Sequence, residues 1–127
     1  MLSTGSVTQA YRVGIADERY EIYMPDKMGA LCDVVSGANK AYSIELLTRT
    51  MSPEVLICDE LCEADSAPLQ SALNGGVAII ATSHAANLEE ALRRPFICDM
   101  YSKGMFPLIV RLFRKENLFG HELIYVC

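Results

Sequence analysis

Polar side chains of the kinds used in catalysis follow each of three short apolar runs in this 127-residue chain. They are carboxylates, a hydroxyl and an imidazole: Asp17, Glu18 and Glu21 after residues 12–16, Asp59 and Glu60 after residues 55–58, and Thr82 and His84 after residues 77–81. Carboxylates bind hard cations such as Mg²⁺ and orient water, and an imidazole can donate a hydrogen bond to a phosphate. If the three run ends meet in the fold, they predict magnesium-assisted phosphate chemistry.

The pair Asp59–Glu60 has the form of a Walker B segment, an apolar strand that ends in two acids. In such a segment the first carboxylate holds Mg²⁺, and the second orients the water that attacks a γ-phosphate. We therefore assign the metal to Asp59 and the catalytic role to Glu60. The alternative is that both acids only solvate the turn that follows the strand.

The other polar groups also have structural explanations. Residues 17–19 can form an exposed acidic turn with an ion pair worth under about 1 kcal/mol, and His84 can bond its own neighbouring backbone. Three arginines fit solvated helix faces better than contact with a neighbouring subunit's phosphate: Arg49, Arg93 and Arg94. Convergence of the three run ends is what favours function.

A phosphate-binding loop is missing from the sequence. A Walker A loop needs Gly-x-x-x-x-Gly-Lys-Ser/Thr, because its glycines let backbone N–H groups surround the phosphates and its lysine neutralises them. No Gly-Lys dipeptide occurs in the chain, and residues 36–40, Ser-Gly-Ala-Asn-Lys, have one glycine at the wrong spacing. We therefore reject residues 36–40 as a Walker A loop.

The three apolar runs are expected to be strands of a parallel sheet. None of them alternates polar with apolar residues, and continuous apolar runs are typical of strands covered on both faces. In an open α/β sheet, right-handed crossovers bring the carboxyl ends of such strands to one edge, where ligands bind. The expected fold class is α/β, with the polar residues converging at that edge.

Capping residues and apolar spacing predict three helices, at residues 39–50, 66–73 and 87–95. Asp65 or Ser66 is expected to cap the second helix. Asn87 opens the third with Glu90 in a capping-box arrangement, and Pro95 stops it.

The rest of the chain gives weaker signals. Residues 106–113 and 122–126 are interpreted as an antiparallel pair of strands around a turn at residues 115–117. Residues 23–37 show no clear period and are interpreted as a long functional or mobile loop.

Composition bounds the class of protein. The net charge of −5 and the absence of a basic stripe argue against nucleic acid as a partner. No basic leader or run of about 20 apolar residues is present, so a soluble chain with one core is expected. Five scattered cysteines favour free thiols in a reducing cytoplasm over disulfides, and over a zinc site with His84 or His121: Cys32, Cys58, Cys62, Cys98 and Cys127.

Several segments together resemble one known family. They are residues 11–19 (Tyr-Arg-Val-Gly-Ile-Ala-Asp-Glu-Arg) with Glu21-Ile22, residues 50–60 (Thr-Met-Ser-Pro-Glu-Val-Leu-Ile-Cys-Asp-Glu), residues 81–85 (Ala-Thr-Ser-His-Ala), residues 87–90 (Asn-Leu-Glu-Glu) and Arg94-Pro95. The chain from Tyr11 to Val126 resembles the stage III sporulation protein AA family, a relative of the secretion and pilus-retraction ATPases. The resemblance implies a partial, three-layer RecA-like P-loop ATPase fold, formed by a single domain over residues 1–127. The strand and helix that carry the Walker A loop would precede residue 1.

The resemblance also implies roles for residues and for partners. Asp17, Glu18 and Glu21 match the acidic box of these motors, the 59–60 pair matches Walker B, and His84 matches the histidine box. Glu18 and His84 then join Glu60 as catalytic residues, and three residues bind the cofactor: Asp17, Glu21 and Thr82. The implied cofactors are ATP and Mg²⁺. The implied setting is a hexamer in the mother-cell cytoplasm of a spore former, docked on membrane-embedded channel proteins.

The resemblance predicts the sheet as well. Strands at residues 12–16, 55–58 and 77–81 should be parallel neighbours. The place of the missing strand should be taken by a strand near residues 96–100 or 106–113, or by another chain. Two local departures from the family are Tyr20, where glycine is expected, and Leu61-Cys62, where a small or glycine-containing turn is expected.

Three functions are weighed. The first is an ATPase-family domain that turns over no ATP alone, because the phosphate loop is missing. The second is a non-enzymatic module for oligomerisation or docking in a membrane-associated sporulation complex. The third, which we favour least, is a Mg²⁺-dependent phosphotransfer domain that uses Asp17, Glu18 and Asp59, because Lys103 is a poor candidate for the lysine it needs.

Overall fold

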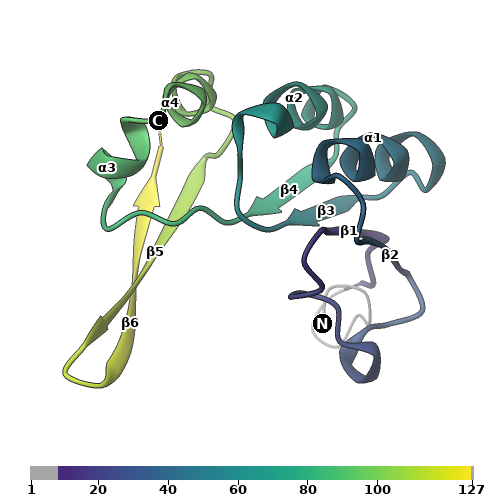
Figure 1. Cartoon of the computed structure of the whole chain (residues 1–127), viewed down its shortest axis with the longest axis horizontal. Helices are drawn as coiled ribbons and strands as arrows, with labels where there is room; N and C mark the ends of the chain where they lie inside the picture. Colours follow the sequence, from purple (N-terminus) through teal and green to yellow (C-terminus); the bar gives the residue numbers. More distant parts are fainter. Residues whose placement is uncertain (1–8, 127) are drawn as a thin grey trace. The chain divides into compact units, whose positions relative to one another are not determined.

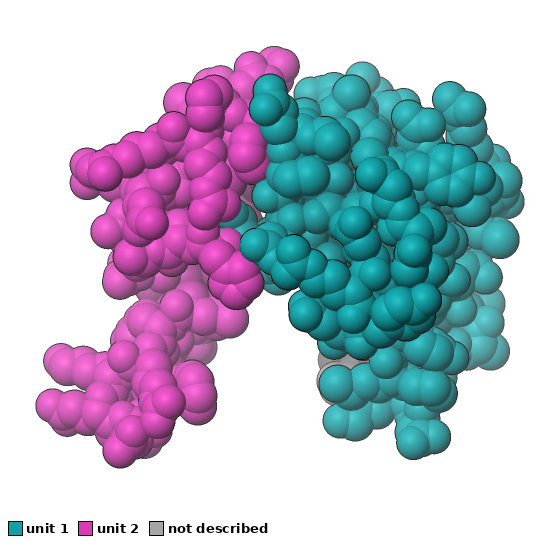
Figure 2. Space-filling model, viewed as in Figure 1, with its two compact units in different colours: residues 1–83 teal, residues 84–127 magenta. Residues whose placement is uncertain are grey.

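The computed structural model describes residues 9–126, which fall into two compact units on either side of the Ser83–His84 bond (Figure 2). A compact unit can be a whole domain or part of one, so the expectation of a single domain over residues 1–127 stays a prediction.

The first unit is built on a four-stranded parallel sheet (Figure 1). The strand order is β2-β1-β3-β4. The strands are β1 (Val13–Asp17), β2 (Cys32–Ser36), β3 (Val55–Cys58) and β4 (Ala78–Ala81). Ile15 lies opposite both Val34 and Ile57, and Ile57 lies opposite Ile80. The prediction that the three apolar runs are parallel neighbours is confirmed.

Two expectations about this sheet were wrong. Residues 23–37 are not one long loop, because they contain the 3₁₀ turn η1 (Pro25–Lys27) and the edge strand β2. The strand has exposed Asp33 beside half-buried Val34, and a short edge strand covered only in part gives no continuous apolar run. Neither residues 96–100, which are helical, nor residues 106–113 join this sheet, and β4 is its terminal strand among the described residues. The remaining alternative, another chain that pairs with this edge, stays a prediction.

Two helices cover one face of the sheet, α1 (Lys40–Thr50) and α2 (Ser66–Asn74) (Figure 1). Asn39 caps α1, since its side chain accepts a hydrogen bond from the N–H of Tyr42 at 3.2 Å. Between helices and sheet lies a buried core: Ala16, Ile44, Leu47, Leu56, Leu69 and Ala72. Both helices were predicted within a residue of their observed bounds.

The segment between β1 and β2 packs on the other face of the sheet, opposite the helices. The strand side chains on this face alternate with those that point into the core. Val13, Ile15 and Val55 form a second apolar cluster, against which Ile22 and Met28 pack. A loop therefore covers residues that point to this face, and the predicted three-layer arrangement stays a prediction.

The second unit contains the helices α3 (Leu88–Leu92) and α4 (Pro95–Ser102). Asn87 accepts the N–H of Glu90 at 2.9 Å, so the predicted cap is confirmed. The Glu90 carboxylate reaches back as well, but it accepts the N–H of Ala86 at 2.9 Å and not that of Asn87, as a capping box would require. The predicted helix nevertheless ends before Pro95, which instead begins α4. Proline suits a first helical turn, because the missing N–H would be unpaired there anyway.

A two-stranded antiparallel hairpin completes this unit, with β5 at Leu108–Lys115 and β6 at Leu118–Tyr125. Its turn residues Glu116 and Asn117 have φ of 50° and 66°, as a two-residue hairpin loop requires. The predicted hairpin is confirmed, and its strands are extended to the turn. Leu112 and Phe119 are 78% and 85% exposed, so this ribbon leaves large apolar side chains uncovered.

The described helices are short. The longest, α1, has 11 residues, whereas a helix needs roughly 20 apolar residues to span a bilayer. Over residues 9–126, no helix is long and apolar enough to cross a membrane.

Candidate functional site

The carboxyl ends of β1, β3 and β4 lie at one edge of the first unit's sheet. Ala16 is in register with Cys58, and Cys58 with Ala81, so the residues that follow them emerge at the same level. This edge brings together residues that the sequence placed far apart, from the acidic segment after β1, the Asp59–Glu60 pair and Thr82. We call it the acidic edge.

Glu60 is held at the acidic edge by contacts from two other segments of the chain. Its backbone N–H donates to the hydroxyl of Thr82 at 2.9 Å, and its carboxylate pairs with the Arg19 guanidinium at 3.0 Å. Its φ is +33°, in the left-handed region that non-glycine residues rarely adopt. Residues after β1 and β4 thus hold the glutamate that the sequence assigned as catalytic.

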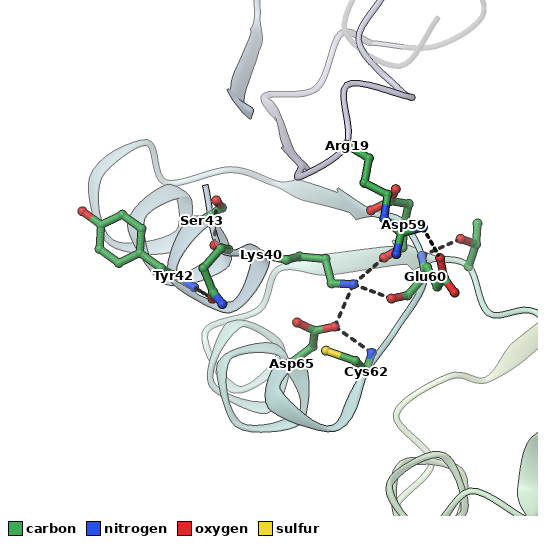
Figure 3. Close-up of polar contacts among 10 residues, drawn as sticks. Arg19, Lys40, Tyr42, Ser43, Asp59, Glu60, Cys62 and Asp65 are labelled. Atoms are coloured by element: carbon green, nitrogen blue, oxygen red, sulfur yellow. Dashed lines mark hydrogen bonds and ion pairs between the residues drawn. The ribbon is translucent and has the colours of Figure 1, made fainter. Parts of the chain in front are cut away.

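Lys40, at the start of α1, provides a further contact to this strand end (Figure 3). Its ammonium donates to the backbone carbonyl of Asp59 at 2.8 Å and to that of Glu60, and it pairs with the Asp65 carboxylate at 3.0 Å. Lys40 is 5% exposed and Asp65 is fully buried. A buried ion pair therefore lies directly against the backbone of the predicted Walker B residues.

These contacts exclude one role for Lys40. An ammonium has three donors, and all three are used within the protein. Lys40 is therefore not a free phosphate-binding lysine, in agreement with the rejection of residues 36–40 as a Walker A loop.

Sequence reasoning missed Lys40 and assigned Asp65 only as a helix cap. The structure gives Asp65 no capping bond to α2. Its carboxylate instead accepts the N–H of Cys62 at 2.8 Å and pairs with Lys40. A signal was present, because Lys40 shares the buried stripe of α1 with Ile44 and Leu47. A charge on an apolar stripe, at the helix end where the macrodipole disfavours a cation, requires a buried partner.

Asp17 organises the loop that follows β1. It is fully buried, and its two carboxylate oxygens accept the backbone N–H groups of Glu21, Ile22 and Tyr23 at 2.8, 3.1 and 2.9 Å. These bonds shape the segment that presents Glu18 and Glu21, which are both exposed. The observed role of Asp17 is thus to position its neighbours, and cofactor binding by Asp17, Glu18 or Glu21 stays a prediction.

Tyr20 has the backbone that the family resemblance assigns to glycine. Its φ is +59°, and its ring lies against Gly37, where an added Cβ would come within 2.2 Å of the tyrosine hydroxyl. Tyr20 thus adopts a left-handed backbone, which glycine would adopt more readily. Gly37 has φ of +71°, so glycine is favoured at this contact for its conformation as well.

Asp59 is half-buried, and no other described side chain forms a hydrogen bond or ion pair with its carboxylate. Magnesium in phosphate-processing sites uses one or two carboxylates together with waters and phosphates, so a single open carboxylate fits this ion. Residues 9–126 contain no cluster of three or more histidine, cysteine or acidic side chains that would hold a metal by themselves. Any metal site of this kind would need oxygens from a bound phosphate or water.

His84 is the first residue of the second unit and is exposed. Its carbonyl accepts a hydrogen bond from the guanidinium of Arg94. His84 and Glu60 belong to different units, and their convergence stays a prediction.

Cys58, beneath the acidic edge, is buried at the end of β3. Burial, with the nearby Asp65 carboxylate, raises the pKa of its thiol to about 12. Four cysteines in the described part of the chain are free thiols: Cys32, Cys58, Cys62 and Cys98.

Fold and site together define an α/β protein with a parallel sheet, whose carboxyl edge carries ordered acids at a candidate ligand site. Comparison with known proteins identifies the family. The chain belongs to the family "Sporulation stage III, protein AA", whose model matches residues 3–122. It is 32% identical over 113 residues to stage III sporulation protein AA of Bacillus subtilis (strain 168), covering 84% of this chain and 37% of that relative. The chain thus spans well under half of the relative's length, and no solved structure matches it.

Proposed function

We propose that this chain is part of a RecA-like, motor-type ATPase domain that acts in sporulation, with Asp59 and Glu60 as its Walker B pair. The observation that carries the proposal is the Glu60 strand end, held by Arg19, Lys40 and Thr82 at the acidic edge. An exposed turn that only needed solvation would not require two side chains bonded to its backbone to keep a glutamate in a left-handed conformation.

In this proposal Glu60 orients the water that attacks the γ-phosphate, and Arg19 holds its carboxylate in one direction. Asp59, with its open carboxylate, is the residue that would hold Mg²⁺. Magnesium, when bound, neutralises the charge that develops on the phosphates. Glu18, Glu21, Thr82 and His84 complete the ATP site as acidic-box, strand-end and histidine-box groups.

The proposal includes an incomplete site. No phosphate-binding loop occurs in the 127 residues, and Lys40 has no donor left for a phosphate. The chain by itself is therefore expected to hydrolyse no ATP. The hexameric, mother-cell assembly on membrane-embedded channel proteins is proposed from the family resemblance.

A fusion protein tests the ATPase assignment. It joins the part of the Bacillus subtilis relative that precedes the matched region to residues 9–127 of this chain. We expect Mg²⁺-dependent ATP hydrolysis that Glu60→Gln lowers by about 10²–10⁴-fold, the usual contribution of such a group. Glu63→Gln, a change at an exposed acid in the next turn, is the matched control and should have no effect. A folded fusion without hydrolysis would contradict the ATPase role, and micromolar Mg-ATP binding by the 127 residues alone would contradict the incomplete site.

A second candidate, self-association without catalysis, is favoured by the exposed apolar hairpin. One face of β5–β6 carries Val110, Leu112, Phe119, Leu123 and Tyr125, each at least 48% exposed. An isolated two-stranded ribbon is marginal in water, so a second copy of the chain is the proposed cover. Sedimentation at several concentrations should show a dimer or larger species that Leu112→Ser with Phe119→Ser abolishes. A monomer at all concentrations would exclude this candidate.

A further inference from the structure

Buried charges are rare in the described part of the chain, and two of them face each other beside Glu60. Lys40 and Asp65 are 5% and 0% exposed, and their charged atoms lie 3.0 Å apart. Removing two charges from water costs several kcal/mol per ion, which their attraction offsets only with good geometry and further hydrogen bonds. The further hydrogen bonds that Lys40 and Asp65 make therefore indicate what the ion pair does in the protein.

Lys40 directs its two remaining donors to a single place, the consecutive carbonyls of Asp59 and Glu60 (Figure 3). The Glu60 N–H is held separately by the hydroxyl of Thr82. Side chains from two other elements thus fix both the N–H and the C=O of a residue with φ of +33°. Left-handed backbone of this kind persists only where its surroundings over-determine it.

Asp65 in turn fixes Lys40. The carboxylate oxygen that pairs with Lys40 also accepts the N–H of Cys62, in the turn that follows Glu60. The other oxygen is buried and has no hydrogen-bond partner, so Lys40 is the only countercharge that the described residues place at ion-pair distance from Asp65. The Cys62 N–H thus holds the Asp65 carboxylate, Asp65 holds the Lys40 ammonium, and Lys40 holds the carbonyls at the end of β3.

We propose that Lys40 and Asp65 are a positioning pair that sets the backbone conformation of Asp59–Glu60. The use of Glu60 in hydrolysis rests on the proposed function, but the conformational role does not need it. If the pair served only to pack α1 against the sheet, neutral side chains of similar size could replace it without a change at Glu60.

The unaltered chain gives the first test. In the ¹⁵N,¹³C-labelled protein, scalar couplings across hydrogen bonds are expected between the Lys40 side-chain nitrogen and the carbonyl carbons of Asp59 and Glu60. Lack of both couplings, with the Lys40 ammonium in fast exchange with water, would overturn the proposal without any substitution.

Variants separate positioning from stability. Lys40→Met combined with Asp65→Asn removes both charges and leaves an oxygen for the Cys62 N–H. We expect a stability near that of the unaltered chain, but amide exchange at Glu60 at least about tenfold faster, the factor for one typical hydrogen bond. Its ¹³Cα shift should also leave the left-handed range. Ser43→Ala, a buried change one turn along α1, is the control and should leave Glu60 unaltered.

A double variant with unaltered Glu60 exchange and carbon shifts would show that the pair does not position the strand end. These measurements use no nucleotide. If the fusion protein is inactive but Glu60 is perturbed in the double variant, the ATPase role is rejected and the positioning pair is retained. If the fusion protein is active but Glu60 is unaltered in the double variant, the ATPase role is retained and the positioning pair is rejected.

Discussion

Replacing Lys40 with methionine is the perturbation whose energetic effect is best defined by the structure. Methionine keeps most of the length of the side chain but removes the charge, and it leaves the fully buried Asp65 without its partner at 3.0 Å. Breaking a buried pair from one side typically costs about 3–5 kcal/mol, because the remaining charge stays desolvated. Domains of this size are stable by only about 5–15 kcal/mol, so Lys40→Met is expected to be marginally folded.

An exposed ion pair in the same protein gives the contrast to that magnitude. The Arg19–Glu60 pair has the same distance of 3.0 Å, but its side chains are 62% and 43% exposed. Solvent screening limits such a pair to under about 1 kcal/mol. Adding Asp65→Asn to Lys40→Met removes the uncompensated charge and should recover most of the loss.

Urea unfolding followed by circular dichroism measures all of these variants under one condition. The reasoning would be refuted if Lys40→Met cost under about 1 kcal/mol, as an exposed pair does. It would also be refuted if the double variant were no more stable than the single one. Ser43→Ala, with its bond to the Asn39 carbonyl at 3.0 Å, calibrates the loss of one buried hydrogen bond on the same helix.

Four further predictions follow from the structure. Arg19→Ala should lower the free energy of unfolding by under about 1 kcal/mol in low salt, and a larger loss in urea titrations would contradict the exposure of that pair. Gly37→Ala should cost about 1–2 kcal/mol, because φ is +71°, and an unchanged urea midpoint would argue against the left-handed turn. Asn87→Ala should cost about 1 kcal/mol and raise amide exchange in α3, whereas unaltered exchange would argue against the cap. Burial raises the pKa of Cys58 from 9.0 to about 12, so the stability from this thiol is full below pH 9 and is lost as pH rises towards 12. The free energy of unfolding should therefore fall more steeply with pH above 9 in the unaltered chain than in Cys58→Ala, by at most about 1.4 kcal/mol per pH unit, and equal slopes would contradict the buried thiol.

Much of the fold could be predicted because its signals are local. The continuous apolar run at residues 55–58 is a strand, and Asn87 caps a helix as its position predicts. Proline is informative but ambiguous, since Pro95 was interpreted as the end of one helix and proved to begin another. The helix boundary moved because the same fixed φ suits both the residues after a helix and the first turn of the next.

Strand β2 marks the limit of such patterns. A central strand that is buried on two faces must be apolar throughout, so its sequence is easy to detect. An edge strand forms because a neighbouring strand offers hydrogen bonds to its backbone, and here that neighbour is β1. The left-handed conformations of Tyr20 and Glu60 have the same origin. Contacts distant in sequence, with Gly37 and with Lys40 and Thr82, accompany backbone states that the local sequence does not favour.

The acidic edge shows which features of this protein the sequence determines and which depend on the tertiary structure. By itself, the sequence determined three of the four strands of the sheet, their polar ends and the pair Asp59–Glu60, because residue type and spacing encode burial and turn chemistry directly. Only the tertiary structure identified Lys40 and Asp65 as the ion pair behind that site, since 24 positions separate them in the sequence. A buried charge is stable only with a partner, and the packing of α1 and α2 over the sheet places that partner 3.0 Å away.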